Sequence, residues 1–115
     1  MSRYPENRFN QYHAHLYYDQ NTLGQAEALI RQAASLDDIA IGHMHRRPVG
    51  PHPDWSCQIS FASEQFDTVI PWLEQHRNGL NVLVHGVTDN DLLDHTEHAA
   101  WLGEARPLDI SIFQS

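Results

Sequence analysis

Residues 12–18 read YHAHLYY, and the alternation within this stretch decides the fold. Successive side chains of a β-strand point to opposite faces, so Ala14 and Leu16 share one face while His13 and His15 share the other. The apolar face must pack against a core. The stretch therefore predicts a half-buried strand whose histidines lie on the side away from the packed helices.

Apolar patterns farther along the chain predict two helices and three more strands. The first helix is expected to open with a capping box of Thr22 and Gln25 and to end near residue 35. The second carries its apolar stripe over residues 66–73, and Pro71 should kink or break it. Alternating or apolar runs predict strands over residues 39–46, 55–61 and 81–85.

The order strand, helix, strand, strand, helix, strand predicts an α+β ferredoxin-like fold, an antiparallel sheet with helices on one face. A third helix, capped by Thr88 or Asp91 and running to Trp101, is expected as a C-terminal extension together with a strand over residues 108–113. The length fits a single domain, residues 1–115. Because the other sheet face would be open, we expect a homodimer.

Composition excludes several classes of partner. Seven Arg, no Lys and fifteen acidic residues give a net charge of -8, which opposes binding to nucleic acid or to an anionic membrane. No apolar run approaches the roughly 20 residues that span a bilayer, and the N-terminus lacks a signal-peptide core, so a cytoplasmic protein is expected. The single cysteine, Cys57, falls in a predicted strand and is interpreted as a buried structural thiol.

Histidine is the unusual component, with nine in 115 residues. In the ferredoxin-like order the fourth strand pairs antiparallel with the first, which brings His85 near His13. The apolar Val82 and Val84 belong to the core face, so His85 should share the open face with His13 and His15. Three neutral imidazoles there predict a site for Fe, Zn, Cu or Ni, the alternative being solvated or dimer-buried histidines.

Two further histidines are candidates for contact with a substrate. His45, with His43, forms a second H-x-H on a strand expected at the sheet edge, too far for easy ligation of the same ion. His52 lies in a proline-rich loop expected at the far end of the sheet from His85, unless the loop folds over the open face or enters a partner's site. A loop residue stiffened by its flanking prolines is the alternative.

The predicted third helix carries paired histidines and carboxylates. Asp91 and His95, like Asp94 and His98, are spaced i, i+4, which usually gives only local helix contacts. Asp94 and Glu97 are nevertheless the nearby carboxylates able to complete a set of two histidines and one carboxylate. The glutamate spacing after H-x-H that a cupin site requires is not met.

Four blocks in this order resemble the signature of the DOPA 4,5-dioxygenase family. They are YHAHLYYD at residues 12–19, HRRPVGPHP at 45–53, WLEQHRNGLNVLVHGVTDND at 72–91 and DHTEHAAWLG at 94–103. The resemblance implies a ferredoxin-like α+β fold, usually dimeric, and Fe(II)-dependent extradiol cleavage of a catechol such as DOPA by O2.

The resemblance also implies which histidines form the site. The family's histidines correspond here to His13, His15, His45, His52 and His85. The strand geometry ranks His13, His15 and His85 first as metal ligands. His45 or His52 is then the group that takes a phenolic proton and later returns it.

Other interpretations remain open. Arg46, Arg47 or Arg77 could hold a substrate carboxylate, although each is more simply a surface charge. The chain could instead be a non-catalytic module that binds a divalent metal or small ligand, or a cofactor-free oxygenase or decarboxylase. The fold alone does not choose among these functions.

Overall fold

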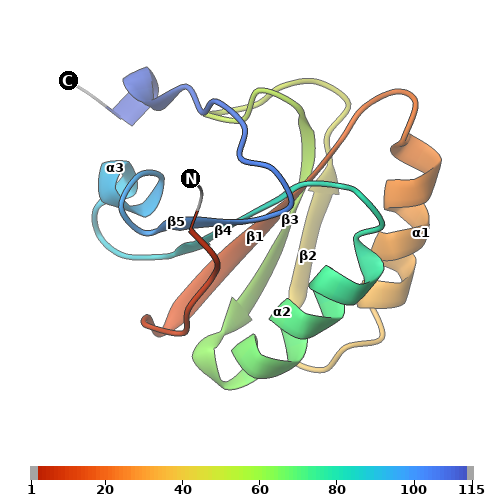
Figure 1. Ribbon diagram of the computed structural model, residues 1–115, viewed down its shortest axis with the longest axis horizontal. Helices are drawn as coiled ribbons and strands as arrows, with labels where there is room; N and C mark the ends of the chain where they lie inside the picture. The colour runs from red at the N-terminus through yellow and green to blue at the C-terminus, as the bar shows by residue number, and fades with distance from the viewer. Residues whose placement is uncertain (1–2, 114–115) are drawn as a thin grey trace.

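The computed structural model describes residues 3–113 and has a five-stranded antiparallel sheet at its centre (Figure 1). The strands are β1 (Gln11–Tyr18), β2 (Ala40–Met44), β3 (Trp55–Ala62), β4 (Val82–Gly86) and β5 (Ala99–Leu102). Their order across the sheet is β2-β3-β1-β4-β5. The central position of β1 and the edge position of β2 are those expected from the sequence.

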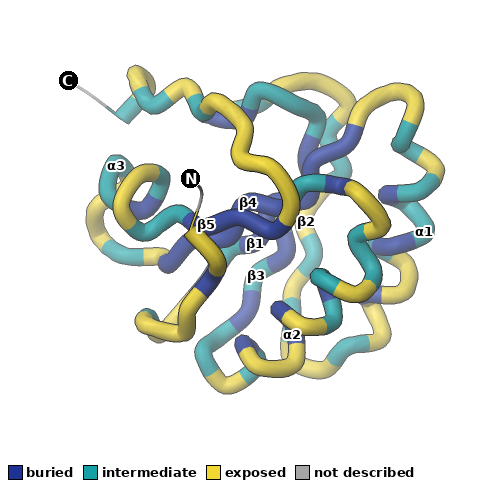
Figure 2. The backbone as a smooth tube through the Cα atoms, viewed as in Figure 1, coloured by how far each residue is buried: buried dark blue, intermediate teal, exposed yellow. Residues whose placement is uncertain are grey.

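Strand β1 divides the molecule into a helical side and a histidine side. It pairs with β3 and β4, and His13 lies directly opposite His85. Ala14 and Leu16 are fully buried beneath the helices α1 (Leu23–Ala33) and α2 (Ser63–His76), which cover one face. Figure 2 shows this central strand region as the most buried part of the chain. The helices contribute to this core Ala26, Leu29, Phe66, Val69, Ile70 and Leu73.

Both predicted helices form, with differences at two positions. The capping box is wrong, because the Thr22 side chain makes no cap bond and instead accepts a hydrogen bond from the backbone N–H of Asp19. Helix α2 is not broken at Pro71. Because proline has no N–H, Pro71 leaves the backbone carbonyl of Asp67 without its helical hydrogen-bond partner. Both residues are exposed, so water can bond to that carbonyl.

The C-terminal helix prediction is wrong beyond its first turn. Helix α3 covers only Asp91–Asp94, and Asn90 caps it by accepting from the N–H of Leu93. Ala99–Leu102 form β5 instead, with Ala100 opposite Val84 on β4. β4 is buried along its whole length, so the backbone N–H and C=O groups on its edge away from β1 need hydrogen bonds from another strand. Pairing of residues 99–102 with that edge overrides their local helix propensity.

The strand predicted over residues 108–113 is also wrong. These residues form an irregular stretch that ends in a 3-10 helix, Ile110–Phe113. The segment crosses the sheet face opposite α1 and α2 and is tied to the proline-rich loop by a bond from the N–H of Asp109 to the carbonyl of Pro51. A lone segment without a strand neighbour cannot satisfy its backbone as a strand.

The histidine face is therefore partly covered by its own chain. Helix α3, the C-terminal segment and the loop that carries His52 all lie on that side (Figure 1). We expected a homodimer because this face of the sheet would be open, and the covering segments leave less of it available to a second copy. The homodimer stays a prediction, which light scattering of the purified protein would test.

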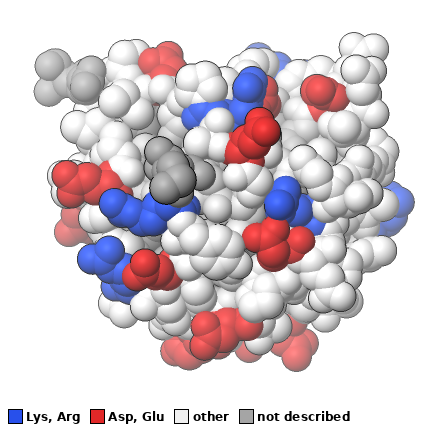
Figure 3. All heavy atoms as spheres, viewed as in Figure 1, with Lys and Arg blue, Asp and Glu red and all other residues white. Residues whose placement is uncertain are grey.

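Surface charge is mixed on the face drawn in Figure 3, where arginines lie beside acidic side chains rather than in a continuous basic stripe. Arg106 pairs with Asp54, and Arg77 pairs with Glu74. Within residues 3–113, no helix has the length and apolar character needed to cross a membrane.

A pair of glycine substitutions tests the turn that ends β5. Gly103 has φ +84°, and an added Cβ would lie 2.6 Å from Asn81 Oδ1 and 2.9 Å from Arg77 Nη1. Gly103→Ala should lower the free energy of unfolding by about 1–3 kcal/mol through strain and collision. Gly24→Ala, in α1 with open space around it, should raise it by up to about 1 kcal/mol. Equal effects in urea titrations would contradict this picture.

Candidate metal centre

Three histidines from two neighbouring strands converge on the face opposite the helices. His13 and His15 come from β1 and His85 from β4, and one ring nitrogen from each lies within 4.8 Å of the others. The Nε2 atoms of His15 and His85 are 3.1 Å apart. His15 and His85 are buried, whereas His13 is partly exposed. The structure thus brings together the three residues ranked first from the sequence.

Two more imidazoles flank this histidine triad, as we call His13, His15 and His85. The ring of His52 lies 4.2 Å from that of His15, and the ring of His95 lies 4.4 Å from that of His85, centroid to centroid. The proline-rich loop folds over the histidine face, which is the condition under which the sequence placed His52 near the site. Five histidines therefore cluster on this face, and three of them, His15, His52 and His85, are buried.

The backbone fixes the orientation of His85. Its Nδ1 lies 2.9 Å from the carbonyl oxygen of Gly86. A carbonyl can only accept, so Nδ1 carries the proton and Nε2 keeps its lone pair directed at His15. A histidine ligand normally has its second nitrogen held in this way.

Burial keeps the imidazoles uncharged. Desolvation lowers the pKa of His85 and of His52 to about 4, and neighbouring histidines add to the shift. The pKa of His15 falls well below its usual value for the same reasons, and that of His13 is lowered by burial and by His95. Metal ions bind the neutral ring, so the triad is in its ligating form at neutral pH.

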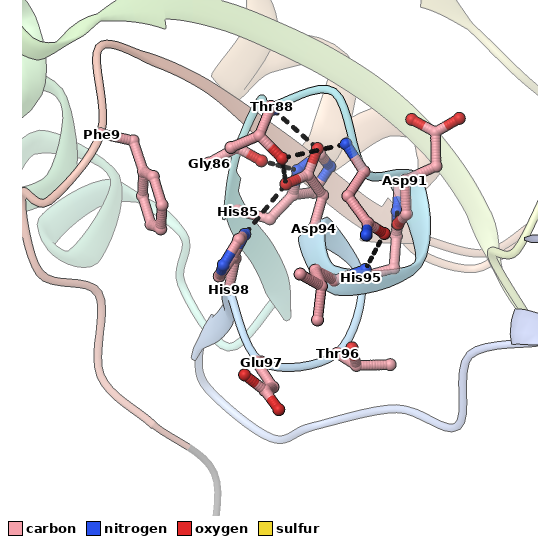
Figure 4. A network of polar contacts seen from close by, with 12 residues as sticks. Phe9, His85, Gly86, Thr88, Asp91, Asp94, His95, Thr96, Glu97 and His98 are labelled. Carbon is pink, nitrogen blue, oxygen red and sulfur yellow. Dashed lines mark hydrogen bonds and ion pairs between the residues drawn. The ribbon is translucent and has the colours of Figure 1, made fainter.

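Asp94 does not complete a set of two histidines and one carboxylate. Its oxygens accept hydrogen bonds from the N–H and hydroxyl of Thr88 and lie 3.0 Å from Nδ1 of His98 (Figure 4). Burial alone would raise the pKa of Asp94, but these bonds together lower it. Glu97 is exposed, so within the described ranges the triad consists of histidines alone.

The i, i+4 pairs expected on a helix are only partly as predicted. Asp94 and His98 make the expected side-chain contact. His95 instead turns its Nδ1 to the backbone carbonyl of Asp91, 2.8 Å away, not to the carboxylate (Figure 4). The Asp94 network thereby anchors the turn that carries His95 beside the triad.

His45 is not brought to the triad. It lies just beyond the edge strand β2, partly buried, with its ring 5.0 Å from that of His43 and its N–H bonded to the carbonyl of Ser56. The structure separates the two H-x-H pairs, as the predicted strand order implied.

A cleft of about 880 Å³ is lined in part by His95, the neighbour of His85, and not by the triad histidines themselves. Trp101, Leu108 and Ile110 give it apolar walls, and its charged lining residues are Arg3, Glu104 and Arg106, the last of which is paired with Asp54. The arginines suggested from the sequence lie elsewhere: Arg77 is paired with Glu74 on the helical side, and the described cleft lining includes neither Arg46 nor Arg47.

Comparison with known families decides the relationship. The model of the Dopa 4,5-dioxygenase family matches residues 12–112. The chain belongs to this family. The resemblance seen in the four sequence blocks is thereby confirmed, and it extends over the segment that carries all five clustered histidines.

Two relatives match most of this chain. A DOPA 4,5-dioxygenase of Amanita muscaria is 30% identical over 115 residues, covering 92% of this chain and 50% of that protein. A 21.2 kDa uncharacterized protein of Botryotinia fuckeliana is 36% identical over 110 residues, covering 85% and 60%. The chain thus spans about half to three fifths of the length of these relatives.

A solved structure resembles the whole fold. The crystal structure of a Nostoc punctiforme protein, described as a candidate dioxygenase, has a TM-score of 0.87, 35% identity and 90% coverage of both chains. The α+β architecture with its antiparallel sheet is therefore shared with a dioxygenase-like protein of similar size.

Sequence reasoning missed two polar groups beside the triad. His95 was interpreted as a local helix residue, and Tyr17, which β-strand alternation places on the face of His13 and His15, was assigned no role in the site. Tyr17 Oη lies 2.7 Å from Nδ1 of His52. The alternation of β1 was enough to place Tyr17 near the site. His95 is positioned by a turn that the local sequence pattern did not predict.

Neutral buried histidines make the metal-free protein acid-sensitive. The unfolded chain binds protons near pH 6.5, but His52 and His85 in the folded chain resist them until about 4. Unfolding therefore takes up protons in this window, and stability should fall by on the order of a few kcal/mol as pH drops through it. Urea titrations after chelation would measure this loss, and His85→Gln should reduce its slope. A flat profile would contradict the assigned burial.

Proposed function

We propose that this protein is a non-haem Fe(II) extradiol dioxygenase that opens the ring of a catechol, such as L-DOPA, with O2. The observation that carries the proposal is the triad of neutral histidines, two of them buried, whose neighbour His95 lines a cleft, in a chain of the Dopa 4,5-dioxygenase family. Family membership supports oxygenase chemistry, while the metal, the mode of cleavage and the substrate are ours to propose.

The donor set fits a ferrous ion. His13, His15 and His85 offer three imidazole nitrogens, a ligand type that suits Fe, Zn, Cu and Ni. Iron bound by three protein groups would keep positions open for both catechol oxygens and O2, and would pass electron density between them without another cofactor. The all-histidine donor set differs from the common two-histidine, one-carboxylate arrangement but is equally able to leave open positions.

The surrounding residues exclude water and receive the substrate. Tyr17, Leu83 and Trp101 form a small apolar cluster on the histidine face. Trp101 also lines the cleft, where it can pack against an aromatic ring, and Arg3 is placed to attract a carboxylate on the ring's side chain, whereas Arg106 is paired with Asp54.

A non-catalytic metal-binding module is the second candidate function. Three imidazoles bind Zn, Ni or Cu more tightly than Fe(II) by the general order of divalent affinities. The two functions differ in one respect that can be measured, because only the dioxygenase consumes O2 and catechol.

Activity of the loaded protein distinguishes these candidates. Anaerobic loading with Fe(II), followed by air and a panel of catechols that includes L-DOPA, should give a yellow ring-opened product and matching O2 uptake. His15→Ala and His85→Ala each remove a triad nitrogen and should lower turnover by roughly 100-fold or more.

His76→Gln is the matched control. His76 stacks on Trp72 in α2, on the other side of the sheet, so this variant should keep full activity. No product from any catechol, together with tight binding of Zn or Ni, would instead support the metal-binding module.

A further inference from the structure

Two histidines beside the triad are held in opposite tautomers. We propose that His52 presents an N–H to the bound catechol while His95 presents a bare nitrogen, so that one stabilises a charged substrate oxygen and the other takes a hydroxyl proton. The roles rest on the proposed dioxygenase function, but the tautomers themselves do not.

Tyr17 fixes the tautomer of His52. The Tyr17 hydroxyl is buried, and His52 Nδ1, 2.7 Å away, is the hydrogen-bond partner it has within residues 3–113. A buried O–H left without an acceptor is costly, so the hydroxyl donates and Nδ1 accepts. The proton of the neutral His52 ring is therefore on Nε2, on the side directed away from Tyr17.

The backbone of α3 fixes the opposite tautomer in His95. Its Nδ1 lies 2.8 Å from the carbonyl oxygen of Asp91, which can only accept, so Nδ1 carries the proton. Nε2 is then the nitrogen with a free lone pair. Phe113 stacks on the ring at a centroid distance of 4.6 Å and limits its rotation.

Both rings belong to the site. Their centroids are 6.4 Å apart, His52 lies against His15, His95 lies against His85, and His95 lines the cleft. A catechol bound at the triad would therefore meet one hydrogen-bond donor and one acceptor, in keeping with its pair of neighbouring oxygens.

The proton transfer balances without an added reagent. The O–H bond of one catechol hydroxyl breaks, its electron pair stays on the oxygen, and an Nε2–H bond forms on His95. The Nε2–H of His52 donates a hydrogen bond to the negative oxygen, as a neutral imidazole can in other enzymes. His52 thus becomes a donor to substrate rather than the proton acceptor suggested by the sequence, and Tyr17 is its positioning residue.

Nitrogen-15 NMR of the histidine rings tests the tautomers in metal-free protein at neutral pH. We expect a protonated Nε2 and bare Nδ1 for His52, and the reverse for His95. Tyr17→Phe should convert His52 to a mixture of tautomers and leave His95 unchanged. A wild-type His52 with its proton on Nδ1 would overturn the proposal by itself, whether or not the variant folds.

Tyr18→Phe is the matched control. It removes another hydroxyl from β1, but one on the helical face that donates to the carbonyls of His45 and Ser56. It should leave both tautomers unchanged, even if it costs as much stability as Tyr17→Phe. An unchanged His52 tautomer in Tyr17→Phe would remove Tyr17 from its positioning role.

Turnover separates this proposal from the proposed function. With Fe(II) and a catechol, Tyr17→Phe should lower kcat by roughly 10-fold relative to Tyr18→Phe. Equal kcat values would overturn the role of His52. If the wild type turns over no catechol but shows the expected tautomers, the dioxygenase function and the catalytic roles are wrong. The tautomer assignment would then still stand.

Discussion

The alternation of side chains along β1 is the constraint on which the rest of the structure depends. β1 is paired on both sides, so its register is fixed by two neighbours at once. Ala14 and Leu16 are fully buried on the helical face, and a slip of one residue would exchange them for His13 and His15. Packing of the apolar core thereby forces His13 and His15 onto the opposite face, where β4 contributes His85.

The protonation state of the histidines on that face is set mainly by burial rather than by neighbouring negative charge. Desolvation holds His15 and His85 neutral, because a charged imidazole would lose its hydration there, and for His85 this outweighs the opposite effect of the Asp94 carboxylate. Within residues 3–113, Asp94 is the one buried carboxylate, and its oxygens are engaged by Thr88 and His98. The arrangement keeps the triad in the neutral form that a divalent ion binds.

Sequence patterns predicted the parts of the fold that follow from local periodicity and strand order. The period of two in residues 12–18 and the antiparallel pairing of β4 with β1 were enough to bring His85 opposite His13. The strand identity of Ala99–Leu102 could not be found this way, since it depends on the backbone groups of β4, which are distant in sequence. The position of His52, which the sequence named as a candidate, and the role of His95 could not be determined from pattern for a similar reason: loops position both residues, held by contacts such as that between Asp109 and Pro51.

The central claim is that His13, His15 and His85 form one metal centre. Anomalous diffraction at the iron edge, from crystals of protein loaded with Fe(II) without oxygen, tests this most directly. We expect a single strong iron peak at roughly 2.0–2.2 Å from one nitrogen of each of these residues, as for other imidazole–metal bonds. Iron bound at His43 and His45, or a full site that omits His85, would contradict it.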